Sequence, residues 1–202
     1  MPGSVRSWPG ACGALLVDVQ GSRTDFAVAL GKDGFAYVVD RDNLGGIHDA
    51  GPQGLASAQV MTGDIEVAPA TFTTNAGTFV TMHGQVGAQG TSCPPGQAGD
   101  LVTIQITADA PPVIKTVWCQ DTQGHGSPIV TSTDGRAESI VWVASAGTTN
   151  RLHGWNGETG ELVYAGGGDA EQMHDLQRFS TLIAVGGRLV VAGFGEVFAF
   201  RP

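Results

Sequence analysis

The sequence has few charged residues and no long apolar run. Charged residues make up only 14% of the 202, and lysine and glutamate are scarce. Because long surface helices are usually rich in Glu, Lys and Ala, this composition disfavours them. No stretch reaches the roughly 18 apolar residues of a membrane-spanning helix, so the sequence predicts no membrane insertion.

Basic residues are particularly few. Lys and Arg total 10 against 19 Asp and Glu, which gives a net charge of -9. A nucleic-acid-binding protein needs clustered cations to displace counterions from phosphates, and these cations are scattered. The sequence therefore argues against a nucleic-acid partner and, for the same reason, against an anionic membrane surface.

Cysteine is also rare. The three cysteines are an odd count, which argues against a dense disulfide framework. Cys93 and Cys119 flank one predicted hairpin, and Cys12 stands alone. A bridge between Cys93 and Cys119 is favoured over two free thiols, because Cys93 lies in a long Pro/Gly loop whose unfolded-state entropy a crosslink would remove.

Glycine, in contrast, is abundant, at 31 residues, and 42% of the chain is apolar. The apolar content argues against disorder. Many short strands joined by glycine-rich turns fit this composition best. The one candidate helix, Ala170–Gln177, is expected to be a loop with a single helical turn.

A short unit of apolar strands and polar turns recurs along the chain, and such repeats decide the fold. The clearest copy has predicted strands at Ser127–Thr131, Ile140–Ala144, Arg151–Trp155 and Glu161–Tyr164. The first copy has Ala14–Asp18, Phe26–Leu30, Phe35–Val39 and a weak outer strand near 56–61. The second has Ala70–Thr73, Thr78–Met82, Leu101–Ile106 and Val113–Trp118. The fourth has Ser180–Ala184, Arg188–Ala192 and Val197–Phe200.

A four-stranded sheet of this kind cannot bury both faces by itself. Stacking several such sheets around an axis buries those faces, which is the β-propeller solution. The sequence therefore predicts an all-β fold, a single β-propeller domain over 1–202 with four-stranded antiparallel blades. The approximate blades are 11–61, 67–120, 126–168 and 178–202. Four aromatic residues could stack on sugar rings: Trp118, Trp142, Trp155 and Tyr164. Three of the four alternate with apolar strand neighbours, which favours packing between blades.

The third repeat resembles a known family at its outer turn. Gly154, Asn156, Thr159, Gly160 and Tyr164 match the spacing of the pattern Ala-x-Asp-x-x-Thr-Gly-x-x-x-Trp. That pattern is typical of the pyrroloquinoline-quinone-like repeats of quinoprotein dehydrogenases and outer-membrane assembly lipoproteins. Gly, Asn and Tyr replace its Ala, Asp and Trp, and each replacement is conservative for a turn closed by a packed aromatic residue.

Three strand phrases also resemble this family: Lys32–Asp40, Gly126–Val130 and Gly187–Ala192. The first repeat keeps Asp40 in the turn pattern, whereas the second, at 108–112, has lost it. The resemblance covers nearly the whole chain and implies the propeller fold. Because function resides in sites carried by folds, it does not by itself imply a bound quinone.

The resemblance also raises the question of ring closure, because members of the family close with about seven or eight blades. Four blades are predicted here, and the last repeat has three strands. We expect this chain to be part of a larger ring whose N-terminal blades are missing, in an extracellular or periplasmic protein. This expectation holds although the first ten residues lack the apolar centre of a signal peptide. The alternatives are a homodimer of the chain and a closed four-bladed ring.

Ligands of propellers usually bind where the loops between second and third strands meet the loops that join blades. This geometry nominates residues from both sets of loops as a pocket for a polar ligand, against the alternative that each is an ordinary turn or strand-edge residue. The candidates are Lys32, Asp33, His83, Asn150 and Arg151 from the first set and His125 and Arg178 from the second.

No catalytic residues are predicted. The chain lacks the adjacent paired cysteines of a quinoprotein alcohol dehydrogenase, and no aspartate can be assigned as its base. No Gly-x-Ser-x-Gly elbow occurs, and nothing specifies a base to activate a nucleophile. No two histidines fall at a short ligand spacing and no Cys-x-x-Cys occurs, so no metal site is predicted. The run Asp40–Asn43 is explained as a turn without calcium.

The sequence thus favours a non-catalytic binding or scaffold module for a protein, a polymer or a glycan. The alternative is a fragment of a dehydrogenase that uses pyrroloquinoline quinone with calcium as its cofactors.

Overall fold

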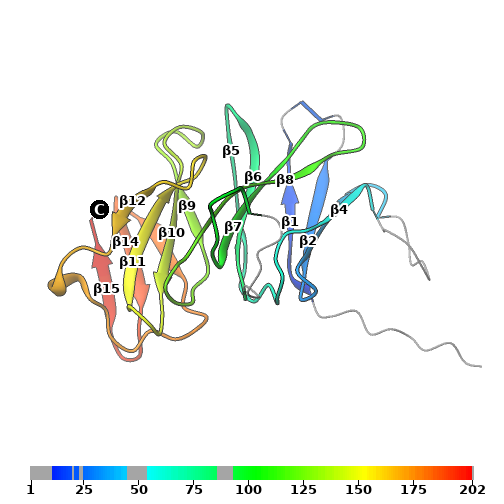
Figure 1. The fold of residues 1–202 in the computed structure, drawn as a ribbon. Coiled ribbons are helices and arrows are strands. Elements are labelled where there is room, and N and C mark those ends of the chain that lie inside the picture. The colour runs from blue at the N-terminus through cyan, green and yellow to red at the C-terminus, as the bar shows by residue number, and fades with distance from the viewer. Residues whose placement is uncertain (1–10, 20, 23–24, 45–53, 86–92, 202) are drawn as a thin grey trace, which may run out of the picture.

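The computed structural model describes residues 11–19, 21–22, 25–44, 54–85 and 93–201. These residues form four antiparallel sheets, each built from strands that follow one another along the chain (Figure 1). We number the sheets as blades 1 to 4 in chain order. Within the described part, no helix is long and apolar enough to cross a membrane.

Blades 1 and 2 each contain four strands in sequence order. Blade 1 comprises β1 (Ala11–Val17), β2 (Phe26–Gly31), β3 (Phe35–Asp40) and β4 (Ala56–Gln59). Blade 2 comprises β5 (Ala70–Thr74), β6 (Gly77–His83), β7 (Leu101–Ile106) and β8 (Ile114–Gln120).

Blade 3 also has four strands, whereas blade 4 has three among the described residues. Blade 3 comprises β9 (Ile129–Thr131), β10 (Ile140–Ser145), β11 (Arg151–Asn156) and β12 (Leu162–Ala165). Blade 4 comprises β13 (Leu182–Val185), β14 (Arg188–Ala192) and β15 (Val197–Phe200). Between them, the expected helical turn is a 3-10 helix at Asp169–Glu171.

The first strands of blades 3 and 4 begin two residues later than the sequence predicts. Ser127 and Ser180, the expected first residues, lie instead in the linkers that enter these blades. The backbone N–H of Ser127 donates to the carbonyl oxygen of Ser180 at 3.1 Å, a normal length for such a bond. This bond joins two linkers rather than two strands of one sheet, so it links blades 3 and 4.

Neighbouring blades pack face to face. Strand β9 lies against both β5 and β13, so the first strands of successive blades are neighbours. Alternating residues of each strand enter an apolar layer between two blades. Val28 and Leu30 of blade 1 share one buried cluster with Val80 and Met82 of blade 2.

The layers between later blades are built in the same way. Trp118 of blade 2 and Trp155 of blade 3 are buried together, as their alternation predicts. The indole N–H of Trp118 donates to the carbonyl oxygen of Gly157 at 2.7 Å, so its polar atom is satisfied within the layer. Trp142 of blade 3 packs in a further layer with residues of blade 4. These stacked sheets are the blades of a β-propeller.

At one end of the blades, the linkers between blades meet the turns between second and third strands. Ile65 forms an isolated β-bridge with Gly84, and His125 forms one with Ala146. The chain thereby gathers residues from distant repeats on one face, which we call the linker face.

Candidate functional site

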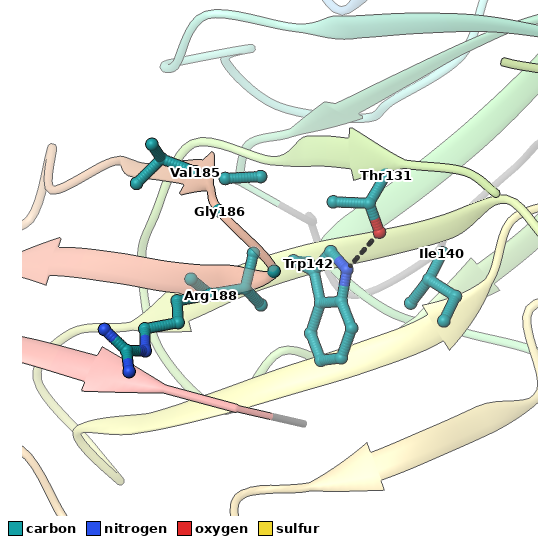
Figure 2. Close-up of a pocket in the computed structure, with 9 residues that line it drawn as sticks. Thr131, Ile140, Trp142, Val185, Gly186 and Arg188 are labelled. Atoms are coloured by element: carbon teal, nitrogen blue, oxygen red, sulfur yellow. Dashed lines mark hydrogen bonds between the residues drawn. The ribbon is translucent and has the colours of Figure 1, made fainter. Parts of the chain in front are cut away.

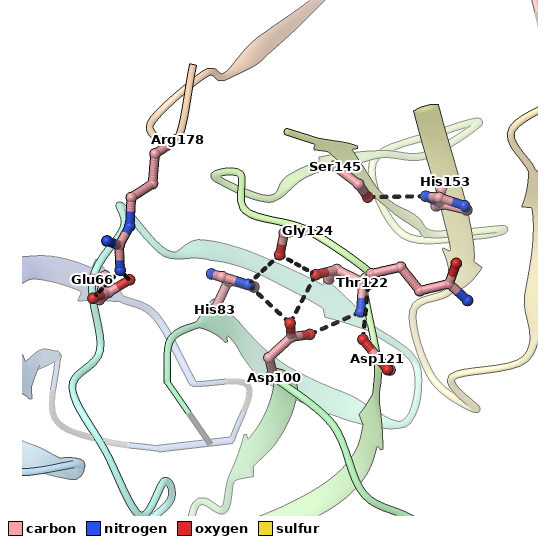
Figure 3. A network of polar contacts seen from close by, with 10 residues as sticks. Glu66, His83, Asp100, Asp121, Thr122, Gly124, Ser145, His153 and Arg178 are labelled. Carbon is pink, nitrogen blue, oxygen red and sulfur yellow. Dashed lines mark hydrogen bonds and ion pairs between the residues drawn. The ribbon is translucent and has the colours of Figure 1, made fainter. Parts of the chain in front are cut away.

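A cluster of ionisable side chains lies on the linker face. We call it the polar cluster and define it as Glu66, His83, Asp100, His125 and Arg178. Its members come from the linkers before blades 2, 3 and 4 and from the end of β6 and the loop before β7. Figure 3 shows Glu66 and Arg178 on one side of His83 and Asp100 on the other.

His83 occupies the centre of the cluster and is only 1% exposed. Its Nε2 lies 3.1 Å from the carbonyl oxygen of Gly124 and 3.3 Å from Oδ2 of Asp100 (Figure 3). Both of these atoms are acceptors, so Nε2 must carry a proton. The aspartate and the linker carbonyl together therefore set the orientation of this ring.

Asp100 is held by the next linker as well as by His83. The backbone N–H of Thr122 donates to its Oδ1 at 2.8 Å, and the Thr122 hydroxyl lies 3.0 Å from its Oδ2. Burial by itself raises the pKa of Asp100, but the bonds from His83 and Thr122 outweigh it and hold the pKa below its usual value. Asp100 is therefore a carboxylate at neutral pH.

A second histidine packs against the first. The rings of His83 and His125 meet edge to face, with centroids 5.6 Å apart. Nδ1 of each ring is buried and has no hydrogen-bond partner among the described residues. Two unpaired polar atoms on rings that pack together are unusual in a folded interior, where buried polar groups are generally hydrogen-bonded.

The other half of the cluster is an ion pair. Nη2 of Arg178 contacts both carboxylate oxygens of Glu66, and the side-chain amide of Gln85 donates to Oε1 of Glu66 at 2.7 Å. Burial raises the pKa of Glu66, but Arg178 and Gln85, with a smaller contribution from His125, hold it below its usual value. Arg178 itself remains 45% exposed, so its guanidinium is accessible at the surface.

Three of the seven residues that the sequence nominates, His83, His125 and Arg178, are thus brought together. Lys32 and Asp33 lie apart, in the turn between β2 and β3. There Asp33 accepts bonds from the backbone N–H of Phe35 at 3.1 Å and from the hydroxyl of Tyr37 at 2.6 Å. Asp33 therefore closes its own turn. Burial, together with the bond to Asp33, raises the pKa of the Tyr37 phenol to about 12.

Asn150 and Arg151 also lie outside the polar cluster. Asn150 adopts a left-handed backbone, with φ of 51°, and its side chain accepts a bond from the N–H of Gly147 at 3.2 Å. Arg151 donates to the carbonyl oxygens of Gly166 and Gly168 and pairs with Asp169 at 3.3 Å. Both residues therefore make local contacts on the linker face and are not part of the polar cluster.

Arg151 instead lines a groove of about 480 Å³ between blades 2 and 3. Inside it, His153 lies 2.9 Å from the Ser145 hydroxyl through Nδ1 (Figure 3). Burial, and secondarily the charge of Arg151, lower the pKa of His153, so this ring is neutral at pH 7. The groove is lined by Ala98, Gln120, Asp121, Gln123, Thr149, Arg151, His153, Trp155, Leu162 and Ala165.

Two members of the polar cluster, Glu66 and Asp100, were not identified from the sequence. Glu66 lies in a linker with no motif around it, and its partner Arg178 is 112 residues away. Asp100 does carry a local signal, because it directly precedes the apolar strand β7 and closes a long loop. The rule that nominated His83 at the start of that loop applies equally to its last residue.

The loop that ends at Asp100 is tied to blade 2. Cys93 and Cys119 form a disulfide with a Cα–Cα distance of 5.7 Å. The side-chain oxygen of Gln97 also accepts a bond from the backbone N–H of Cys119 at 2.8 Å. These two ties anchor the segment that leads into Asp100 and so help to position its carboxylate.

The side chains of the polar cluster do not fit a calcium ion. Calcium takes six to eight oxygen ligands, usually including several carboxylates. Among the described residues, no group of three or more His, Cys, Asp or Glu side chains could hold a metal ion. The two carboxylates of the polar cluster are already engaged, Glu66 by Arg178 and Asp100 by His83 and Thr122.

No protein-family model matches the chain, and neither does any curated protein sequence. The solved structures that are similar to it include the following two. The β-propeller domain of Cps50 (Swd1) from Myceliophteria thermophila aligns with 95% of this chain and 54% of its own, at 15% identity and a TM-score of 0.56. BamB from Moraxella catarrhalis aligns with 95% of this chain and 50% of its own, at 19% identity and a TM-score of 0.45.

The chain thus spans about half the length of the structures that it matches. At 15% identity the likeness to the Cps50 domain concerns the fold. Together with the stacked blades it establishes the class of protein: this chain is a β-propeller.

Proposed function

We propose that this chain is a non-catalytic propeller module that binds a protein partner on its linker face. The observation that supports this function is the combination of the polar cluster with exposed aromatic residues beside it. Arg178 lies 5.8 Å from the ring centroid of Phe179, and Phe179 is itself largely exposed. Phe194, also exposed, is tied to the same face by a bond from its N–H to the carbonyl oxygen of Asp175.

Exposed Phe and Arg residues are enriched at protein interfaces, where they act as anchors. Here the guanidinium of Arg178 offers a charged anchor, and Phe179 and Phe194 offer apolar ones within the same blade. The partly buried Glu66 restrains the arginine in advance, which lowers the entropy that binding costs. This arrangement favours a protein segment that carries carboxylates and apolar side chains over a glycan or another polymer.

We place the module outside the cytoplasm. The Cys93–Cys119 disulfide supports this location, because disulfides persist in secreted and periplasmic proteins and are reduced in the cytosol. The disulfide also fastens the loop that leads into Asp100, which is consistent with a module that works in an oxidising environment.

The function can be tested with a displayed library of random peptides and an array of glycans, each probed with the purified chain. The wild type is expected to enrich peptides, and the double variant Arg178→Ala/Phe179→Ala to lose most of that enrichment. Val163→Ala, at an equally open apolar position on β12, is the matched control and should bind as the wild type does. Peptides retained by the double variant, or selection of glycans alone, would contradict the proposal.

The dehydrogenase alternative has a separate test. Mixing the chain with pyrroloquinoline quinone and calcium should produce no change in visible absorption and no dye reduction with an alcohol. A new absorption band followed by dye reduction would favour the enzyme over the binding module.

A further inference from the structure

The sheet of blade 4 has one apolar face that no described residue covers. In β13 and β15, alternate side chains point away from blade 3, and Ile183, Val185 and Val197 are 59%, 58% and 71% exposed. Apolar side chains so exposed on one sheet face mark an interaction surface. The strand pairing assigns to this surface, which we call the far face, Ile183, Val185, Arg188, Val190, Ala192, Val197 and Ala199.

The same face of the preceding blade is buried. In blade 3, Trp142, Ala144 and Leu152 pack in one cluster with Leu182 and Leu189 of blade 4. In blade 3, the apolar face that corresponds to the far face is therefore covered by the sheet of the next blade. The far face of blade 4 therefore has the character of half an interface between blades.

Blade 1 presents the other half. Its Val17, Val28 and Leu30 point toward blade 2, so the alternate residues form an opposite surface, which we call the near face. On it, Leu16 is 66% exposed. Directly after β1, the side chain of Asp18 is 85% exposed. The strand pairing adds Ala27, Ala29, Tyr37 and Val39 to the near face.

The near face and the far face carry opposite charges, and these charges lie at corresponding ends of the first strands of their blades. Strands β1 and β13 are the first strands of their blades, and both run away from the linker face. If blade 4 packed on blade 1 of a second copy, these two strands would therefore lie side by side. At their ends, Arg188 of one sheet would then meet Asp18 of the other. Val185 and Arg188 flank the turn that lines a pocket with Trp142 of blade 3 (Figure 2). The guanidinium of Arg188 forms no ion pair with a described residue.

Asp18 has a weak partner of its own, since Nη1 of Arg41 lies 3.9 Å from its Oδ1. Its open carboxylate therefore remains available to a second cation. Next to this charged pair, Leu16 of the near face would face the aliphatic side chains of Ile183 and Val185. Small Ala27 and Ala29 leave room beside Leu16 for these larger residues.

We propose that two copies of this chain close one ring, in which blade 4 of each copy packs its far face against the near face of blade 1 of the other. The two contacts are related by a two-fold axis, so both pairs of exposed faces are buried and the assembly is closed. The occupant is a second copy, because one chain supplies both faces and both charges. This assembly goes beyond the proposed ligand binding, which uses the linker face and does not require it.

The test is the solution mass, measured by light scattering over a range of micromolar concentrations. The proposal expects a particle of twice the 20.7 kDa chain mass. Ile183→Glu and Leu16→Glu should each raise the dissociation constant of the dimer at least about 100-fold, because each buries an unpaired charge. Val163→Glu, at a comparably exposed position away from both faces, should leave the dimer unchanged.

Charge reversal tests the register. Asp18→Arg and Arg188→Asp should each raise the dissociation constant about 10-fold, and the double variant should restore it, because the two charges would still be opposite. Circular dichroism of each variant checks that the sheets remain folded. A monomer at all concentrations, an assembly larger than a dimer, or a dimer that survives Ile183→Glu would overturn the proposal.

Discussion

Glu66 and Arg178 lie 112 residues apart in the sequence and form an ion pair on the linker face of the propeller. The pair joins the linker before blade 2 to the linker before blade 4, so it connects sheets that are not neighbours in the chain. It also restrains the arginine that the proposed function places at the binding surface.

Removal of this pair should destabilise the fold. In Arg178→Ala, the mostly buried Glu66 loses its countercharge, and we expect the free energy of unfolding to fall by about 1–2 kcal/mol. Urea denaturation followed by circular dichroism measures it. Arg201→Ala, at an exposed position, serves as the control and should change stability by less than about 0.5 kcal/mol. Equal stability of the two variants would show that the pair contributes nothing.

His153 should make the fold sensitive to mild acid. Its lowered pKa, caused by burial and by Arg151, means that the folded chain binds this proton less readily than the unfolded chain. The contribution of the neutral His153 ring to the free energy of unfolding is therefore fully present above about pH 6.5, the pKa of an unfolded histidine. It is lost as the pH falls through the lowered pKa of the folded chain. His153→Gln should flatten the decline between pH 7 and 5 by at most about 1.4 kcal/mol per pH unit. Exposed His174→Gln should retain the wild-type slope, and a similar flattening in both variants would refute the assignment.

The disulfide should contribute to stability through the unfolded chain. The two cysteines are separated by 26 positions, a loop for which chain entropy predicts a loss of about 3.5 kcal/mol when Cys93→Ser opens it. Chemical denaturation of the variant gives this value. Alkylation with and without reductant, followed by intact-mass measurement, should differ by two labels in the wild type. Equal labelling would show that the cysteines are not bridged.

Gly160 should be the least replaceable glycine of the outer turn in blade 3. Its φ is +72°, and a Cβ there would lie 2.7 Å from ring carbons of Trp118. Gly160→Ala therefore combines backbone strain with overpacking, and we expect a loss of about 3 kcal/mol in thermal or urea unfolding. Gly135→Ala has a similar φ of +84° but open space, so it should cost only about 1 kcal/mol. Similar losses in both variants would mean that the contact with Trp118 is unimportant.

The strands could be predicted from the sequence because their signals are local. Leu101–Ile106, Arg188–Ala192 and Val197–Phe200 have the bounds that their apolar runs and flanking glycines predict. The burial of Trp118 and Trp155 also followed from their alternation with apolar neighbours. Recurrence of the same unit was sufficient to indicate blades that stack.

Only the tertiary structure decided which polar residues meet. His83 and His125 were nominated by their loops, but the sequence could not show that Glu66 and Asp100 complete their cluster or that Arg151 turns toward glycine carbonyls instead. The physical reason is that strand periodicity and turn chemistry act over a few residues. The contacts between linkers depend on the angle at which whole sheets stack, and that angle is set by side-chain packing between blades rather than by any short segment.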